Sequence, residues 1–103
     1  MMLATAAPVL RRVGARPGRP RVCAAVSAHP LDDELILYDE RTGEAHLLNY
    51  TGAFVWRLCD GSRTVGQVAR LAAANFGIPH RQALADVREL VAMLNDANLI
   101  FVR

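Results

Sequence analysis

The ten residues Leu47-Leu48-Asn49-Tyr50-Thr51-Gly52-Ala53-Phe54-Val55-Trp56 decide the fold, since they join the end of a strand to a capped helix without a loop. Asparagine is a favoured N-cap, because its side chain accepts a hydrogen bond from an amide of the first helical turn. After Asn49, apolar residues recur at helical spacing. The sequence therefore predicts a helix from about Tyr50 to Cys59 that follows a strand directly, with Gly61 as its terminator.

Two strands are predicted ahead of this helix. Residues 34–38 combine aliphatic and aromatic side chains, and residues 44–48 alternate in polarity. The stretch Asp39–Gly43 between them has the acidic start and the final glycine of a type I turn that closes through a left-handed residue. We expect these segments to form an antiparallel hairpin. A further short edge strand is predicted at Val22–Val26.

Two more helices are predicted after Gly61. Thr64 and Gln67 have the spacing of a capping box, and an apolar stripe follows them to Phe76. Pro79 suits the first turn of the longest helix, which extends to about Ala97, where Asn98 is expected to end it. The last apolar residues, 99–102, are expected to pack or to pair.

The length of 103 residues fits one domain, and 52% of them are hydrophobic, which is enough for a packed core. Residues 1–21 lack hydrophobic periodicity and are predicted to be a flexible basic tail, which leaves residues 22–103 as the domain. No run reaches the roughly 20 apolar residues that a membrane span needs. We therefore expect a cytoplasmic protein without membrane association.

Charge is distributed unevenly along the chain. The first 30 residues hold five arginines and no acid, whereas the rest holds seven arginines against ten acids. The predicted third helix is itself net acidic, with two arginines against three acids. A DNA-binding helix needs positive charge facing the phosphates, so this balance argues against nucleic acid as the partner.

Catalytic and metal-binding patterns are weak. The three histidines, His29, His46 and His80, fall in different predicted elements, and the two cysteines, Cys23 and Cys59, are far apart. The acids at 32–34 and 39–40 sit in turns, where carboxylates serve as local hydrogen-bond acceptors. The sequence predicts no enzyme activity, no metal site, no cofactor and two free cysteines.

A hairpin followed by three helices is the order of a winged helix-turn-helix domain with its wing placed first, an α+β fold. Within this order, residues 35–100 resemble the PqqD-like proteins, which recognise precursor peptides of ribosomally made, modified peptides. The matching motifs are the Asn-x-Thr-Gly-Ala-x-Val-Trp run at 49–56, Asp60-Gly61, Thr64-Val65, Phe76-Gly77 and Asp86-Val87. The chain looks like the free-standing members found beside lasso-peptide systems, although Asn98 stands where relatives usually have glycine.

The resemblance implies a non-catalytic module with an N-terminal hairpin or three-stranded sheet and three helices. It would bind the leader region of a precursor peptide by strand addition and deliver that peptide to a separate modifying enzyme. The implied contacts come from one strand and from the third helix, whose outward margin stays open between Leu84 with Val91 and Leu90 with Ala97. The candidate residues are Glu44, Ala45, His46, Leu47, Leu48, Leu84, Asp86, Val87, Leu90 and Val91. The alternatives are a DNA-binding winged helix and a small scaffold subunit that binds another protein.

Overall fold

The fold comes from a computed structural model, which describes residues 18–102. Residues 1–17 of the expected tail lie outside the described residues, whereas Pro20 and Arg21, which were assigned to the tail, belong to the first strand. The elements in chain order are β1 (Pro20–Val22), β2 (Val26–Leu31), β3 (Glu34–Asp39), β4 (Glu44–Leu48), α1 (Tyr50–Leu58), α2 (Val65–Phe76), α3 (His80–Asp96) and β5 (Ile100–Val102).

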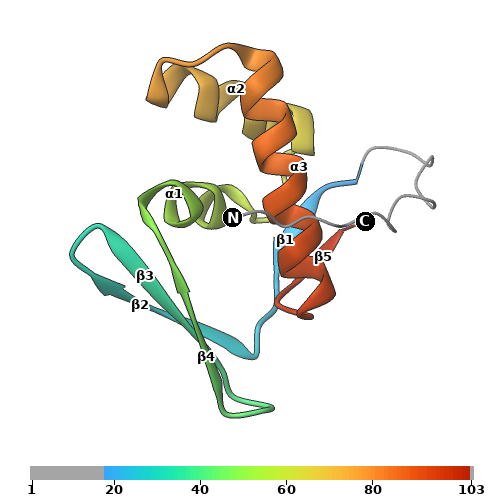
Figure 1. The fold of residues 1–103 in the computed structure, drawn as a ribbon. Helices are drawn as coiled ribbons and strands as arrows, with labels where there is room; N and C mark the ends of the chain where they lie inside the picture. The colour runs from blue at the N-terminus through green and yellow to red at the C-terminus, as the bar shows by residue number, and fades with distance from the viewer. Residues whose placement is uncertain (1–17, 103) are drawn as a thin grey trace.

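The strands form two sheets. β2, β3 and β4 make a three-stranded antiparallel sheet in that order, and β1 pairs with β5 in a separate two-stranded ladder. Figure 1 shows the three-stranded sheet below α1, while α3 crosses the molecule from α2 at the top to the β1–β5 ladder. The fold is the α+β arrangement predicted from the sequence, with a three-stranded sheet ahead of three helices.

One hydrophobic core joins the sheet to the helices. Leu35 and Leu37 on β3 are almost fully buried, and they belong to the same cluster as Leu48, Trp56 and residues of all three helices. Alternate residues of a strand point to opposite faces, so β3 turns one apolar face toward the helices. The sheet is thereby packed on one side only.

The predicted helix starts are confirmed. Asn49 accepts a hydrogen bond from the amide of Gly52 at 2.9 Å, which caps α1 one residue after β4 ends. Thr64 and Gln67 form the complete capping box of α2. Pro79 stands at the N-cap of α3, one position before the first helical turn where the sequence predicted it.

The end of α3 is closed by a residue in the left-handed conformation. Asn98 has φ 62°, its amide donates to the carbonyl of Asn95, and the amide of Leu99 donates to the carbonyl of Leu94 at 2.9 Å. This is the hydrogen-bond pattern of a Schellman motif, in which asparagine can replace glycine. The predicted terminating role of Asn98 is confirmed.

The prediction of a strand at Val22–Val26 is wrong. β1 ends at Val22 and β2 begins at Val26, so the segment between them connects two sheets. β2 was not predicted, because its sequence VSAHPL includes a proline and lacks clear alternation. The predicted apolar C-terminal segment does pair, since Ile100–Val102 forms β5.

Candidate functional site

The outer edge of β4 is open. β4 pairs with β3 and with no other strand among residues 18–102. The amide of Glu40, just after β3, donates to the carbonyl of Ala25, just before β2. Because the direction of backbone hydrogen bonding alternates along a strand, the even-numbered residues of β3 bond to β2 and the odd-numbered ones bond to β4. Glu44, His46 and Leu48, which face the odd residues, therefore bond to β3. Their alternation leaves the N–H and C=O groups of Ala45 and Leu47 directed away from the sheet.

The opposite edge of the same sheet is blunted. By the same alternation, the backbone groups of β2 that point away from β3 belong to Val26, Ala28 and Pro30. The amide of Val26 already donates to the carbonyl of Cys23, and Pro30 has no amide hydrogen. Only Ala28 offers an outward donor on β2. Proline on an edge strand is a common protection against unwanted pairing, so β4 is the edge better suited to receive another strand.

The two faces of β4 differ in their surroundings. Glu44, His46 and Leu48 lie opposite Asp39, Leu37 and Leu35, so they share the face that turns toward the helices. Leu48 is buried there, whereas His46 is half-buried and Glu44 is exposed. The remaining two residues lie on the outer face, where Leu47 leaves 59% of its surface exposed.

The predicted α3 residues divide by burial. Val87 and Val91 are buried in the core, with 2% and 6% of their surface exposed, so they support the fold first. Leu84 and Leu90 are half-buried, and Asp86 is exposed. Asp86 makes no hydrogen bond or ion pair with another described side chain, which leaves its carboxylate available to a ligand.

The two margins of α3 differ in exposure. Leu90 is half-buried and Ala97 is exposed, whereas the other margin ends at the buried Val91. Met93 lies on the Leu90 margin at helical spacing and is 46% exposed. Met93 was not among the residues predicted from the sequence, although it lies three positions after Leu90. We call the surface formed by Asp86, Leu90, Met93 and Ala97 the α3 stripe.

A buried carboxylate links the β3–β4 turn to the end of α3. Asp39 is 3% exposed and accepts hydrogen bonds from Arg41 at 2.9 Å through the backbone amide, Nε and Nη2. Nη2 of Arg41 also donates to the carbonyl of Asn98 at 2.6 Å. The guanidinium hydrogen bonds hold the pKa of Asp39 below its usual value, against the opposing effect of burial.

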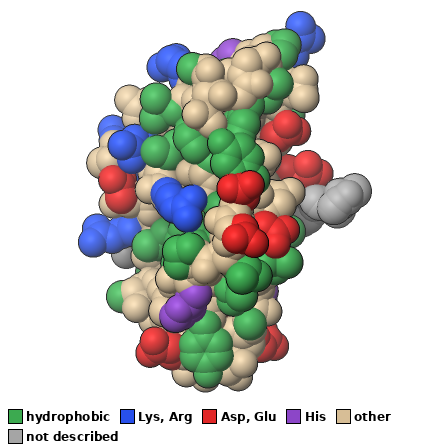
Figure 2. All heavy atoms as spheres, turned by 90° about the vertical axis from the view of Figure 1, so that its left-hand side faces the viewer, with side chains coloured by type: hydrophobic (Ala, Val, Ile, Leu, Met, Phe, Trp, Pro, Cys, Tyr) green, Lys and Arg blue, Asp and Glu red, His purple; other side chains and the backbone are tan. Residues whose placement is uncertain are grey.

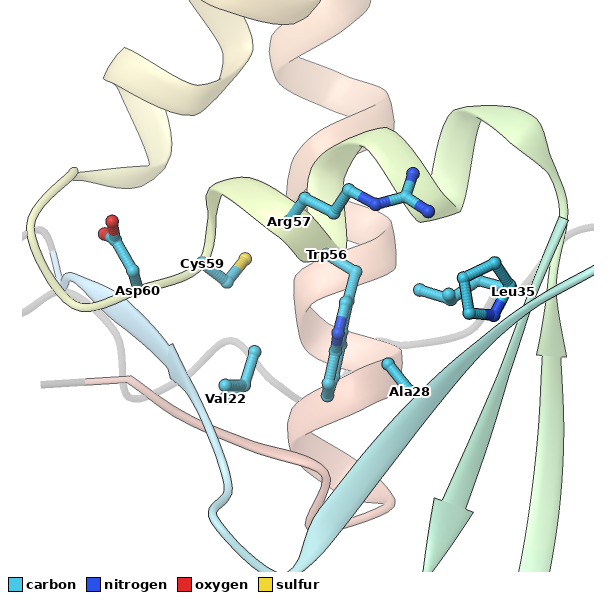
Figure 3. Close-up of a pocket in the computed structure, with 8 residues that line it drawn as sticks. Val22, Ala28, Leu35, Trp56, Arg57, Cys59 and Asp60 are labelled. Atoms are coloured by element: carbon cyan, nitrogen blue, oxygen red, sulfur yellow. The ribbon is translucent and has the colours of Figure 1, made fainter. Parts of the chain in front are cut away.

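A cavity lies elsewhere, at the β2 edge. It measures about 390 Å³ and is lined by Val22, Ala28, Pro30, Leu35, Trp56, Arg57, Cys59 and Asp60. Figure 3 shows the Trp56 indole standing in this cavity between Val22 and Ala28, while Arg57 points away along α1. None of the ten candidate residues lines it, so the candidate site is a strand edge and a helix surface and not an enclosed pocket.

Among the described residues, no group of three or more His, Cys, Asp or Glu is placed to hold a metal ion. Both cysteines are free and buried, as predicted. Burial raises the pKa of the Cys59 thiol to about 12, so this thiol is a poor nucleophile at neutral pH.

One face of the molecule shows how the charges are distributed. In Figure 2, hydrophobic side chains cover much of the face, with acidic groups among them and basic groups scattered mainly along the left side and at the top. This face therefore offers no broad basic surface to a phosphate backbone. Among the residues that the structure describes, no helix has the length and apolar character to cross a membrane.

A comparison with protein families supplies the assignment. The family described as coenzyme PQQ synthesis protein D (PqqD) matches residues 34–100. The chain belongs to the PqqD family. The match begins with β3 and ends in β5, so the whole β3–α3 unit of this PqqD-family chain is included.

Two solved structures share the fold. One is titled "TbiB1 in Complex with the TbiA(beta) Leader Peptide"; it is 21% identical, covers 78% of this chain and 93% of its own, and has a TM-score of 0.71. The other is titled "Lasso peptide synthetase B1 complexed with the leader peptide", with 23% identity, coverage of 81% and 98%, and a TM-score of 0.72. A search of curated proteins finds no match.

Proposed function

We propose that this PqqD-family protein binds the leader region of a ribosomal precursor peptide as an added strand on β4 and presents it to a separate modifying enzyme. The observation that carries this proposal is the open edge of β4, with the backbone groups of Ala45 and Leu47 directed outward. The two structural neighbours support it, because both are complexes with a leader peptide.

Strand addition needs main-chain partners and side-chain pockets. The outward N–H and C=O groups of Ala45 and Leu47 provide up to four main-chain hydrogen bonds to an antiparallel peptide strand. Side chains of that peptide alternate between the two faces of the sheet. We expect peptide side chains on the Leu47 side to pack on the outer face of the sheet. We expect those on the His46 side to point toward the helices and to reach the apolar part of the α3 stripe, Leu90 and Met93.

The protein would be a recognition module without chemistry of its own. Among the described residues, the one buried carboxylate is that of Asp39, and it is held by hydrogen bonds from Arg41. Binding the leader would raise the effective concentration of the precursor at the enzyme. Such a module works in the cytoplasm, where precursor peptides are made.

A scaffold role is the second candidate, and the exposed Leu47 and Tyr38 on the outer face of the sheet favour it. A protein partner that covers this face would bury these side chains without pairing with β4. DNA binding has no comparable support, because α3 carries Arg81 and Arg88 against three acids.

Hydrogen exchange tests the proposal directly. The probes are synthetic leader peptides from short precursor genes encoded beside this chain, with scrambled peptides of equal composition as controls. The amides of Ala45 and Leu47 should become protected by the cognate leader alone, whereas the outward amide of Ala28 on β2 should not change. Trp56 is 6% exposed and lies at the β2 edge, so its fluorescence should change little.

Several outcomes would contradict strand addition on β4. Protection at Ala28 in place of Ala45 would move the site to the other edge of the sheet. If amide exchange slows elsewhere on the sheet, without protection at Ala45 or Leu47, the result would favour the scaffold role. Saturable binding to duplex DNA, with no response to any leader, would favour a regulator.

A further inference from the structure

The two surfaces of the proposed binding site are connected at only one end by the hydrophobic core. At the α1 end of β4, Leu48 belongs to the same buried cluster as Val87 and Val91 of α3. At the other end, Glu44 is exposed. No hydrogen bond or ion pair joins β4 itself to α3 within residues 18–102. The Glu44 end of β4 therefore has no direct polar bond to α3 among these residues.

Arg41 supplies that connection. Its Nη2 donates both to Oδ2 of Asp39, at 2.9 Å, and to the carbonyl of Asn98, at 2.6 Å. Asp39 is the last residue of β3 and lies opposite Glu44, the first residue of β4. Asn98 is the left-handed residue that follows α3. One side-chain nitrogen therefore bridges the hairpin end to the helix end, across 57 positions of sequence.

Both partners of Arg41 are themselves fixed. Asp39 is 3% exposed, it lies opposite Glu44 in the β3–β4 ladder, and its carbonyl accepts from the amide of Gly43 at 2.8 Å. The residue after Asn98 is held twice, since the amide of Leu99 donates to Leu94 and its carbonyl accepts from the amide of Cys23, both at 2.9 Å. A planar guanidinium with several donors suits such a bridge, because one group can bond a carboxylate and a carbonyl together.

We propose that Arg41 is a positioning residue, which sets the spacing between β4 and the C-terminal half of α3 and so preorganises these two surfaces for the leader peptide. The inference rests on the proposed function, because it assigns a role within that site. Arg41 itself acts through Asp39 and Asn98. A preorganised site binds more tightly, since binding then spends no free energy on ordering β4 and α3 relative to each other.

The spacing is measurable without any ligand. Nitroxide labels on the exposed positions Glu40→Cys and Glu89→Cys report the distance from the hairpin to α3, because Cys23 and Cys59 are buried. In the full chain the distance distribution should be narrow. Arg41→Ala should broaden it, whereas Arg70→Ala should leave it unchanged. Arg70 is exposed on α2, and its replacement removes the same charge from a side chain with no hydrogen bond to another described residue.

Leader binding provides the second measurement. Arg41→Ala should weaken binding of the cognate leader by about tenfold or more, chiefly through faster dissociation, because β4 and α3 are then no longer held at a fixed spacing. Arg41→Lys should recover part of the affinity, since lysine can bond either the carboxylate or the carbonyl but lacks the planar fork. Arg70→Ala should bind like the unaltered protein.

The two measurements separate the possible failures. An unchanged distance distribution in Arg41→Ala overturns the positioning role. Weakened binding with an unchanged distribution also overturns it, because Arg41 would then contact the peptide directly. A broadened distribution with unaltered affinity shows that the spacing does not matter for binding and overturns the role as well. Failure of the unaltered protein to bind any leader overturns the proposed function, while the distance measurement still reports whether Arg41 holds the two elements.

Discussion

The amide of Gly52 donates to Oδ1 of Asn49 at 2.9 Å, and this bond starts α1 one residue after β4 ends. Gly52 lies close to the end of β4, since a Cβ atom at this position would be 3.3 Å from Cβ of Leu48. Strand, cap and helix therefore form one rigid junction. The orientation of the β4 edge relative to the helices depends on this junction, which makes it the first target for mutation.

Asn49→Ala should lower the free energy of unfolding by about 1 kcal/mol, because it removes the side-chain acceptor for an amide of the first turn. Asn49→Asp should be nearly neutral, since a carboxylate accepts the same bond and is favourable at a helix N-terminus. Denaturant unfolding followed by circular dichroism measures both. Equal destabilisation by the two variants would show that the Asn49 side chain stabilises the fold by some means other than capping.

Asp39 should make stability depend on acidic pH. Its pKa is held below the ordinary value of 3.8 mainly by the side-chain hydrogen bonds from Arg41. A carboxyl group whose pKa is lower in the folded state than in the unfolded state stabilises the folded protein. This stabilisation is complete when the pH is above the unfolded-state pKa, and it is lost as the pH falls through the folded-state pKa. The free energy of unfolding should therefore drop as the pH is lowered below about 4.

The matched variant for this pH effect is Asp39→Asn, which cannot titrate. Its stability difference from the unaltered protein should be largest near neutral pH and should shrink as the pH falls below about 4. Asp60 also has a lowered pKa, caused first by the hydroxyl of Ser62, and it titrates in both proteins. A stability difference that stays constant from neutral to acidic pH would contradict the assignment to Asp39.

Proline substitution separates the two edges of the sheet. Ala45→Pro removes an outward amide from β4 and no bond to β3, so the protein should fold while leader affinity falls by about tenfold or more. Ala28→Pro makes the equivalent change on β2 and should leave affinity unaltered. Isothermal titration with the cognate leader compares the two. Equal effects of both prolines would be inconsistent with strand addition on β4.

The α3 stripe can be tested without damaging the core. Met93 is 46% exposed, so Met93→Glu should keep the fold and still weaken leader binding, because it places a charge where an apolar side chain docks. Leu90→Glu should weaken binding further at some cost in stability, since Leu90 is half-buried. Val87→Glu is unsuitable, because Val87 is 2% exposed and a buried charge would unfold the domain.

Leu71 on α2 provides the control for the stripe. It is 43% exposed, close to the value for Met93, and it lies on a different helix. Leu71→Glu should leave leader affinity unchanged when both variants are measured by fluorescence anisotropy of a labelled leader. Normal binding by Met93→Glu, or a loss of binding by both variants, would remove the stripe from the site.

Local interactions determined the parts of the fold that the sequence alone predicted. The Asn49 cap, the Thr64–Gln67 capping box and the left-handed Asn98 each depend on residues within one or two turns of the chain. The β3–β4 hairpin is equally local, since Gly43 with φ 80° closes its turn. Such features are readable because the groups that bond are already neighbours in sequence. The family resemblance followed from the same motifs.

The tertiary structure decided the rest, because it depends on which distant elements meet. β2 pairs with β3 despite its proline, and that pairing leaves the open edge on β4. Burial separated Val87 and Val91, which support the core, from the half-buried Leu90 and the exposed Met93. Arg41 lies in a turn, and no local pattern could indicate that it would reach the carbonyl of Asn98. Only the packing of the sheet against the helices brings those two groups within bonding distance.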